Sequence, residues 1–79
     1  MESNESKYRK AFAENFGIEN SELDKLEYQS ISDWDSVGHM GLIAQLEEAF
    51  NIQIEMDDVI ALNSFEKGKE IMQKYGVSI

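Results

Sequence analysis

The sequence predicts an all-α fold, a bundle of three main helices plus one short helix with a long first loop, in a single domain over residues 1–79. Three observations favour this fold. Apolar residues recur at spacings of three and four in three long segments. No segment alternates polar and apolar residues over a length typical of a strand. With 79 residues, of which 42% are hydrophobic, the chain can bury one thin core but not two.

The first helix is expected from about Glu5 to Phe16. Its aromatic residues recur every four positions, at Tyr8, Phe12 and Phe16, so they share one face. Gly17 follows at once and suits the left-handed conformation that ends many helices. The long loop after it should contain one capped turn over residues 21–24 and be anchored by four apolar residues: Ile18, Leu23, Tyr28 and Ile31.

The second helix is expected to begin at Asp35 or Ser36, because both are good N-cap residues, and to end near Phe50 or Asn51. Apolar residues cover a broad part of its surface. We expect the following to form its buried face: Val37, Met40, Ile43, Ala44, Leu46 and Phe50.

A buried extended linker and two further helices should complete the chain. Ile52 and Ile54 alternate as buried linker residues, and Asp57 to Leu62 suits a short third helix. Ser64 is a plausible cap for the last helix. Apolar contacts are expected from Val59, Ile60 and Leu62 in the third helix, and from Phe65, Gly68, Ile71, Met72 and Tyr75 in the last. Gly68 should permit close packing of the last helix, and Gly76 should end it.

Charge is concentrated in the middle of the chain. From Leu26 to Glu66 there are nine acids and no Lys or Arg, while the other seven acids match the seven bases, so this stretch carries the whole net charge of −9. Nucleic acid is disfavoured as a partner because its phosphates would be repelled. A basic patch on another protein is the natural complement. The acids are equally consistent with a solvated surface that keeps a small protein soluble.

Several function classes are disfavoured by what the sequence lacks. Without cysteine there is no disulfide, thiol nucleophile or zinc–thiolate site. No apolar run approaches membrane-spanning length, so we expect no stable membrane insertion. The sequence lacks the pattern of a secretory signal, which is a basic segment followed by an apolar stretch. We therefore expect a soluble cytoplasmic protein.

The motif that points to a function is Trp34-Asp35-Ser36-Val37-Gly38-His39-Met40. A serine at a helix start usually caps the helix, but the partial positive charge there also tolerates a phosphate ester. Asp35-Ser36-Val37 resembles the Asp-Ser-Leu signature of acyl carrier proteins. The resemblance covers the whole chain and is carried further by Tyr28-Gln29-Ser30-Ile31, Leu42-Ile43, Leu46-Glu47-Glu48-Ala49-Phe50, Ile54, Asp57-Asp58 and Leu62-Asn63-Ser64-Phe65.

The resemblance implies an acyl-carrier-like bundle and a non-catalytic carrier. A phosphopantetheinyl transferase would move 4′-phosphopantetheine from coenzyme A to Ser36, using a magnesium ion held mainly by the transferase. The arm would carry acyl groups as thioesters for fatty-acid-like or specialised biosynthesis of lipids, polyketides or surface glycans. Enzymes with basic docking patches would load, modify and unload this cargo. Such carriers are typically monomeric, and we expect a monomer.

Partner-binding roles follow from the same resemblance. Asp35 would cap the helix and be recognised by the transferase. Four acids would meet Lys and Arg on partners: Glu47, Glu48, Asp57 and Asp58. Three apolar residues of the second helix, Val37, Met40 and Ile43, would line the path along which cargo folds back between helices, unless they are simply core.

Departures from the family pattern narrow this expectation. Gly38 and Gly41 stand where fatty-acid carriers usually have acids, and Glu55 stands where many have proline. Service to a housekeeping fatty acid synthase is therefore not implied. The two glycines cost helix stability, about 1 kcal/mol each relative to Ala. They let a partner or the arm approach closely, or they reflect drift.

Other interpretations stay open at this point. Ser36, His39 and a nearby Asp could form a hydrolase triad, but one exposed helix start does not readily supply the base, orienting group and oxyanion hole. We expect His39 to be solvated or hydrogen-bonded in the loop. Glu55, Asp57 and Asp58 lack the spacing of a calcium loop, so no metal site is expected. An aminoacyl or peptidyl carrier, or an unmodified acidic interaction module, remains an alternative.

Overall fold

The computed structural model describes residues 2–79 and contains five helices in that range. In chain order they are α1 (Asn4–Phe16), a 3₁₀ helix η1 (Asn20–Lys25), α2 (Ser36–Phe50), α3 (Met56–Ala61) and α4 (Phe65–Lys74). The described residues form no strand; one isolated bridge joins Glu27 to Ser64. The predicted all-α bundle with three main helices is confirmed. A short 3₁₀ helix inside the first loop is the one element that the sequence indicated only as a turn.

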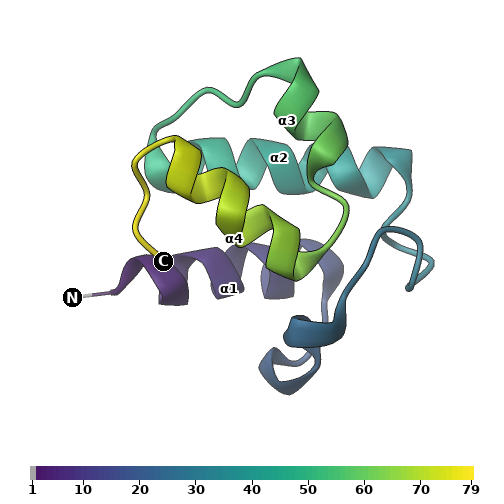
Figure 1. The fold of residues 1–79 in the computed structure, drawn as a ribbon. Coiled ribbons are helices and arrows are strands. Elements are labelled where there is room, and N and C mark those ends of the chain that lie inside the picture. The colour runs from purple at the N-terminus through teal and green to yellow at the C-terminus, as the bar shows by residue number, and fades with distance from the viewer. Residues whose placement is uncertain (1) are drawn as a thin grey trace.

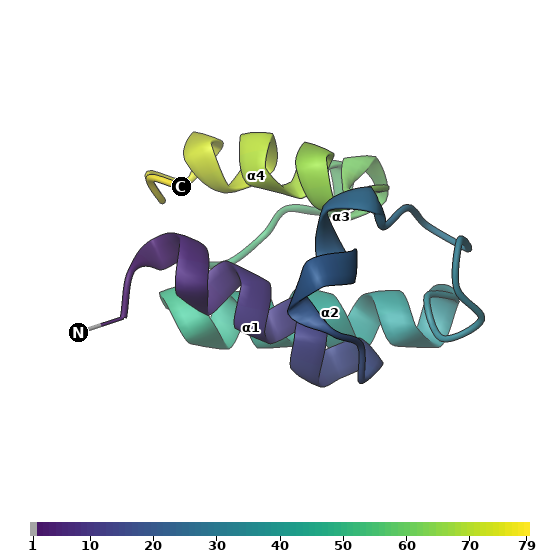
Figure 2. The same ribbon diagram turned by 90° about the horizontal axis from the view of Figure 1, so that it is seen from below.

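The helices lie in two layers. α1 and α2 run side by side in one layer, and α4 lies across them in the other, next to α3 (Figures 1 and 2). Both ends of the chain lie on the same side of the molecule (Figure 1), where the Asn4 side-chain amide donates to the Ser78 carbonyl (3.2 Å). The opposite side holds the long loop that follows α1 and the start of α2 (Figure 1).

An aromatic cluster fills the core between the layers. The Phe12 ring lies at its centre and contacts the rings of Tyr8 (4.9 Å between centroids), Phe65 (4.9 Å) and Trp34 (5.7 Å). All four side chains are fully buried. The Tyr8 hydroxyl donates to the Phe65 carbonyl (2.7 Å), and burial strongly raises the pKa of this phenol. The predicted aromatic face of the first helix is confirmed.

Side-chain caps fix where the helices begin. Asp35 accepts a hydrogen bond from the Gly38 N–H (2.9 Å) at the start of α2, and Ser64 accepts one from the Lys67 N–H (3.0 Å) at the start of α4. Of the two predicted caps for α2, the structure uses Asp35. The Ser36 hydroxyl is therefore not needed to hold the helix start.

Main-chain hydrogen bonds tie the long first loop to the rest of the fold. The Tyr28 N–H donates to the Asn63 carbonyl (2.8 Å), and the Phe65 N–H donates to the Leu26 carbonyl (2.9 Å). These bonds tie the loop to the junction between α3 and α4. Leu23 is buried as predicted, but Tyr28 is 37% exposed. Tyr28 is therefore held only partly by burial: its main chain bonds to Asn63, and its ring stands edge-on to the buried Trp34.

The buried face of α2 differs from the predicted one. Ile43 and Leu46 are buried as expected, and Leu42, which we did not place there, is fully buried beside them. Val37 and Met40 are 82% and 54% exposed, and Ala44 is exposed as well. The reason is packing direction, since α2 turns the side that carries Leu42 toward the core. In α3 the predicted contact of Ile60 is likewise wrong, because its side chain is 73% exposed.

Three glycines lie where two segments come close together. A Cβ atom at Gly68 would lie 2.1 Å from the Tyr8 hydroxyl, which confirms the close packing predicted there. A Cβ atom at Gly38 would lie 1.9 Å from the Asp33 carbonyl oxygen, and one at Gly41 would lie 2.8 Å from Asn15 Oδ1. A backbone contact within the fold thus explains Gly38 without a partner or an arm, whereas the atoms nearest to Gly41 belong to a side-chain amide that can rotate away.

Candidate functional site

Ser36 is the first residue of α2 and is exposed. Its Oγ atom lies 3.3 Å from the Tyr28 hydroxyl, and either group could donate. Because the Asp35 side chain caps the helix by accepting the Gly38 N–H, Ser36 is left as a solvent-facing hydroxyl at the positive end of the helix. Such a position suits an anionic substituent on the oxygen.

Tyr28 approaches Ser36 from the long loop. Its main chain is pinned to Asn63, and the next residue, Gln29, has a left-handed backbone (φ 68°) and donates its N–H to the Trp34 carbonyl (3.0 Å). The Tyr28 ring stands edge-on to the rings of Trp34 (6.4 Å) and His39 (5.8 Å). Its hydroxyl is therefore held beside Ser36 by contacts on both its ring and its backbone.

His39 joins the loop, α2 and α3. The indole N–H of Trp34 donates to His39 Nδ1 (2.9 Å), so Nδ1 is an acceptor and the proton of the neutral ring lies on Nε2. Nε2 then donates to the Val59 carbonyl (2.7 Å). His39 is hydrogen-bonded, as one of our two expectations had it. Both ring nitrogens are engaged elsewhere, so the structure does not assemble the Ser36–His39 pair that a hydrolase triad needs.

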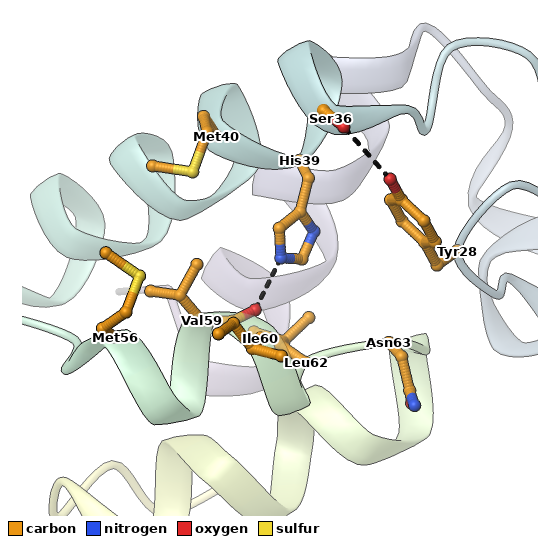
Figure 3. A pocket seen from close by; sticks show the side chains of 9 residues that line it. All are labelled: Tyr28, Ser36, His39, Met40, Met56, Val59, Ile60, Leu62 and Asn63. Carbon is orange, nitrogen blue, oxygen red and sulfur yellow. Dashed lines mark hydrogen bonds between the residues drawn. The ribbon is translucent and has the colours of Figure 1, made fainter.

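A largely apolar groove of about 380 Å³ opens beside Ser36, between α2 and α3. Figure 3 shows Met40 on the α2 side and Met56 on the α3 side, with Tyr28 and Ser36 at one end. Of the three residues predicted to line a cargo path, Met40 lines this groove, whereas Val37 and Ile43 do not. The remaining lining residues are His39, Val59, Ile60, Leu62 and Asn63.

Sequence reasoning missed most of this groove. Tyr28, Met56 and Asn63 come from three different segments, and no periodic pattern joins them. One signal was present: apolar residues on short α3 outnumber the positions that a helix of six residues can bury. The surplus residues, Met56 and Ile60, face the groove from outside the core.

The predicted acidic surface is only partly available. Glu48 and Asp57 are exposed, while one oxygen of Glu47 accepts the Ile54 N–H (2.9 Å). Asp58 is 8% exposed and is the only acid between Leu26 and Glu66 that forms an ion pair within residues 2–79.

Asp58 links α3 to α4. Lys74 and the Tyr75 hydroxyl donate to its two carboxylate oxygens, each at 2.6 Å. The hydrogen bond from Lys74, followed by that from Tyr75, lowers the pKa of Asp58. The same contact raises the pKa of Lys74. Because its carboxylate is used inside the fold, the geometry argues against the docking role predicted for Asp58.

Neither a metal site nor a membrane span is found in the part of the chain that the structure describes. No cluster of three or more potential metal-ligating side chains occurs among residues 2–79. No helix in that range is long and apolar enough to cross a bilayer. In comparisons with protein-family models, curated proteins and solved structures, no match to this chain was found. Its function therefore has to be argued from its own residues.

Proposed function

We propose that this chain is an acyl carrier protein whose Ser36 accepts a 4′-phosphopantetheine arm. One observation carries the proposal: Ser36 is exposed at the start of α2, is not needed as the cap, and lies at the end of an apolar groove. A capping serine would accept a hydrogen bond from a first-turn N–H group, and here the Asp35 side chain accepts the one from Gly38. When bound, the arm would supply a thiol that holds acyl groups as thioesters.

The residues around Ser36 fit such an arm. The helix start favours the negative charge of a phosphodiester, and the Tyr28 hydroxyl can donate to it. The groove beside Ser36 offers mainly carbon and sulfur atoms to an uncharged chain. In the modification itself, a bond forms between Ser36 Oγ and phosphorus. The bond from phosphorus to the adenosine bisphosphate part of coenzyme A breaks, and the serine proton passes to a base of the transferase.

Partners would dock on the surface around Ser36. Val37, Met40, Met56 and Ile60 are large apolar side chains more than half exposed there, on α2 and α3. Glu48 and Asp57 are exposed on the same two helices. Exposed apolar residues supply contact area, whereas unpaired charges mainly raise association rates and weaken in salt. This combination favours short-lived complexes, as a carrier visiting several enzymes requires.

Intact-mass measurement after incubation with coenzyme A and a broad-specificity transferase tests the proposal. We expect a gain of one phosphopantetheine group in the wild type and none in Ser36→Ala. The Ser36→Ala protein should stay folded, because Asp35 provides the cap. Ser32→Ala, an exposed serine in the same loop, is the matched control and should still be modified. No gain in the wild type, under conditions that modify another carrier, would refute the proposal.

The kind of cargo is a separate question. An acyl cargo fits best with the apolar lining of the groove. The proposed compartment is the cytoplasm, where coenzyme A is present. Loading the modified protein with acyl and aminoacyl groups by candidate ligases would separate an acyl from an aminoacyl carrier. If Ser36 is never modified, the unpaired acids instead favour an interaction module that binds a basic protein.

A further inference from the structure

The fold does not depend on the hydrogen bond between Tyr28 and Ser36, because other contacts already hold the two segments that it joins. The helix start is capped by Asp35, and the loop is tied down by the main chain of Tyr28. The phenol nevertheless reaches the one atom to which an arm would be joined. Tyr28 also forms one end of the groove, together with Ser36 (Figure 3).

We infer that Tyr28 is a positioning residue for the arm: its hydroxyl donates to the phosphodiester on Ser36 and directs the arm into the groove between Met40 and Met56. The inference rests on the proposed function, since it concerns the modified protein. It assigns a polar contact to a residue for which the sequence predicted only an apolar anchoring role.

The direction of the hydrogen bond follows from chemistry. In the unmodified protein either hydroxyl can donate. Once Ser36 Oγ is esterified it has no proton, so only Tyr28 can donate, to this oxygen or to a phosphate oxygen one bond farther away. A hydrogen bond to a charged phosphate is stronger than the neutral bond that it replaces. Modification therefore strengthens the contact.

The placement of the ring limits where the arm can go. Trp34 and His39 hold the Tyr28 ring edge-on, and His39 is itself fixed by bonds at both nitrogens. A phosphate held by this hydroxyl lies at the groove end. The uncharged part of the arm can then cover the side chains of Met40 and Met56, which are 54% and 68% exposed. Covering them removes apolar surface from water, which favours the docked arm.

Methionine methyl groups report the docking directly. With ¹³C-methyl methionine, Met40 and Met56 sense the groove, while Met72, fully buried in the core, is an internal reference. We expect the Met40 and Met56 signals to shift when the protein is converted from the unmodified to the modified form, and the Met72 signal to stay. Tyr28→Phe keeps the ring and removes the hydroxyl. It should lower the equilibrium constant for docking roughly tenfold or more, the loss expected for one charge-assisted hydrogen bond, and so reduce these shifts.

Ser30→Ala is the matched control. The Ser30 hydroxyl bonds both to the N–H and to the carbonyl of Glu27, so its loss loosens the same loop without touching the phenol. Conversion shifts in Ser30→Ala should match the wild type. Full shifts in modified Tyr28→Phe, or equally small ones in Ser30→Ala, would overturn the positioning role. Intact mass confirms modification of each sample, so failure of the proposed function is seen separately, as absence of the mass gain.

Discussion

Adding one methyl group at Gly38 should destabilise the protein, although alanine is the better helix former. The added Cβ would lie 1.9 Å from the Asp33 carbonyl oxygen and 3.1 Å from its carbonyl carbon. It would also lie 3.3 Å from Phe16 Cε1. The first two are backbone atoms, so neither can swing aside as a side chain would. The segment before the helix must move, and with it the Asp35 cap.

The expected size follows from opposing contributions. Alanine gains at most about 1 kcal/mol over glycine in a helix. Overpacking typically costs about 1–3 kcal/mol, and weakening of a cap about 1 kcal/mol more. A net loss of about 2 kcal/mol is expected for Gly38→Ala. In a domain of this size it should lower the midpoint of thermal unfolding by roughly 10 °C.

Gly41→Ala is the matched comparison, one turn farther along α2. Its Cβ would meet the amide of Asn15 at 2.8 Å, and a side-chain amide can rotate away. The helix-propensity gain is then offset by the weakened bonds of Asn15 to Gly38 (3.0 Å) and Gln45 (3.3 Å). The midpoint should stay within about 5 °C of the wild type. Thermal and urea unfolding followed by circular dichroism measure both variants, and equal stability of the two would refute the reasoning.

Three further changes test other contacts. Asp58→Asn should lower the free energy of unfolding at neutral pH, because Lys74 and Tyr75 hold the pKa of Asp58 below its unfolded value of about 3.9. The wild type keeps this extra stability above a pH of about 3.9 and loses it as the pH falls through the lowered pKa. Urea unfolding at neutral and acidic pH should therefore show the stabilities of the two proteins converging in acid. Tyr8→Phe removes the buried hydrogen bond from the phenol to the Phe65 carbonyl and should cost about 0.5–1.5 kcal/mol in urea unfolding, with an unchanged midpoint counting against that bond. Glu48→Lys should lower kcat/KM for modification by the transferase about threefold at low salt and much less at high salt, whereas a loss independent of salt would mean that its charge does not steer docking.

Local signals predicted the parts of the fold that depend on neighbouring residues. The spacing of Tyr8, Phe12 and Phe16 defined the buried face of α1, because a narrow aromatic stripe leaves one choice of side. Gly17 has the left-handed backbone expected of it (φ 64°), and Ser64 caps α4 as predicted. Each of these contacts is decided within about one turn of helix.

The α2 face could not be chosen in the same way. Apolar residues occur on nearly every side of α2, so periodicity does not say which side meets α1. The choice depends on close approach at Gly38 and Gly41, which only the packed chain reveals. The contacts of Tyr28 with Ser36 and Asn63 were equally out of reach, because they join a loop without periodicity to the ends of two helices. The motif predicted Ser36 as a candidate modification site, whereas only the tertiary structure shows which residues lie next to it.

The apolar side chains around Ser36 are exposed over a closed core. Leu42 and Leu62 are fully buried, so the core is closed without the exposed side chains of Met40, Met56 and Ile60. The bonds of His39 to Trp34 and Val59 join α2 to α3 and hold the groove walls in place. Large apolar side chains held in water over a finished core are typical of a contact surface. Their position next to a serine that is not needed for capping favours a single explanation for both, the carrier function proposed here.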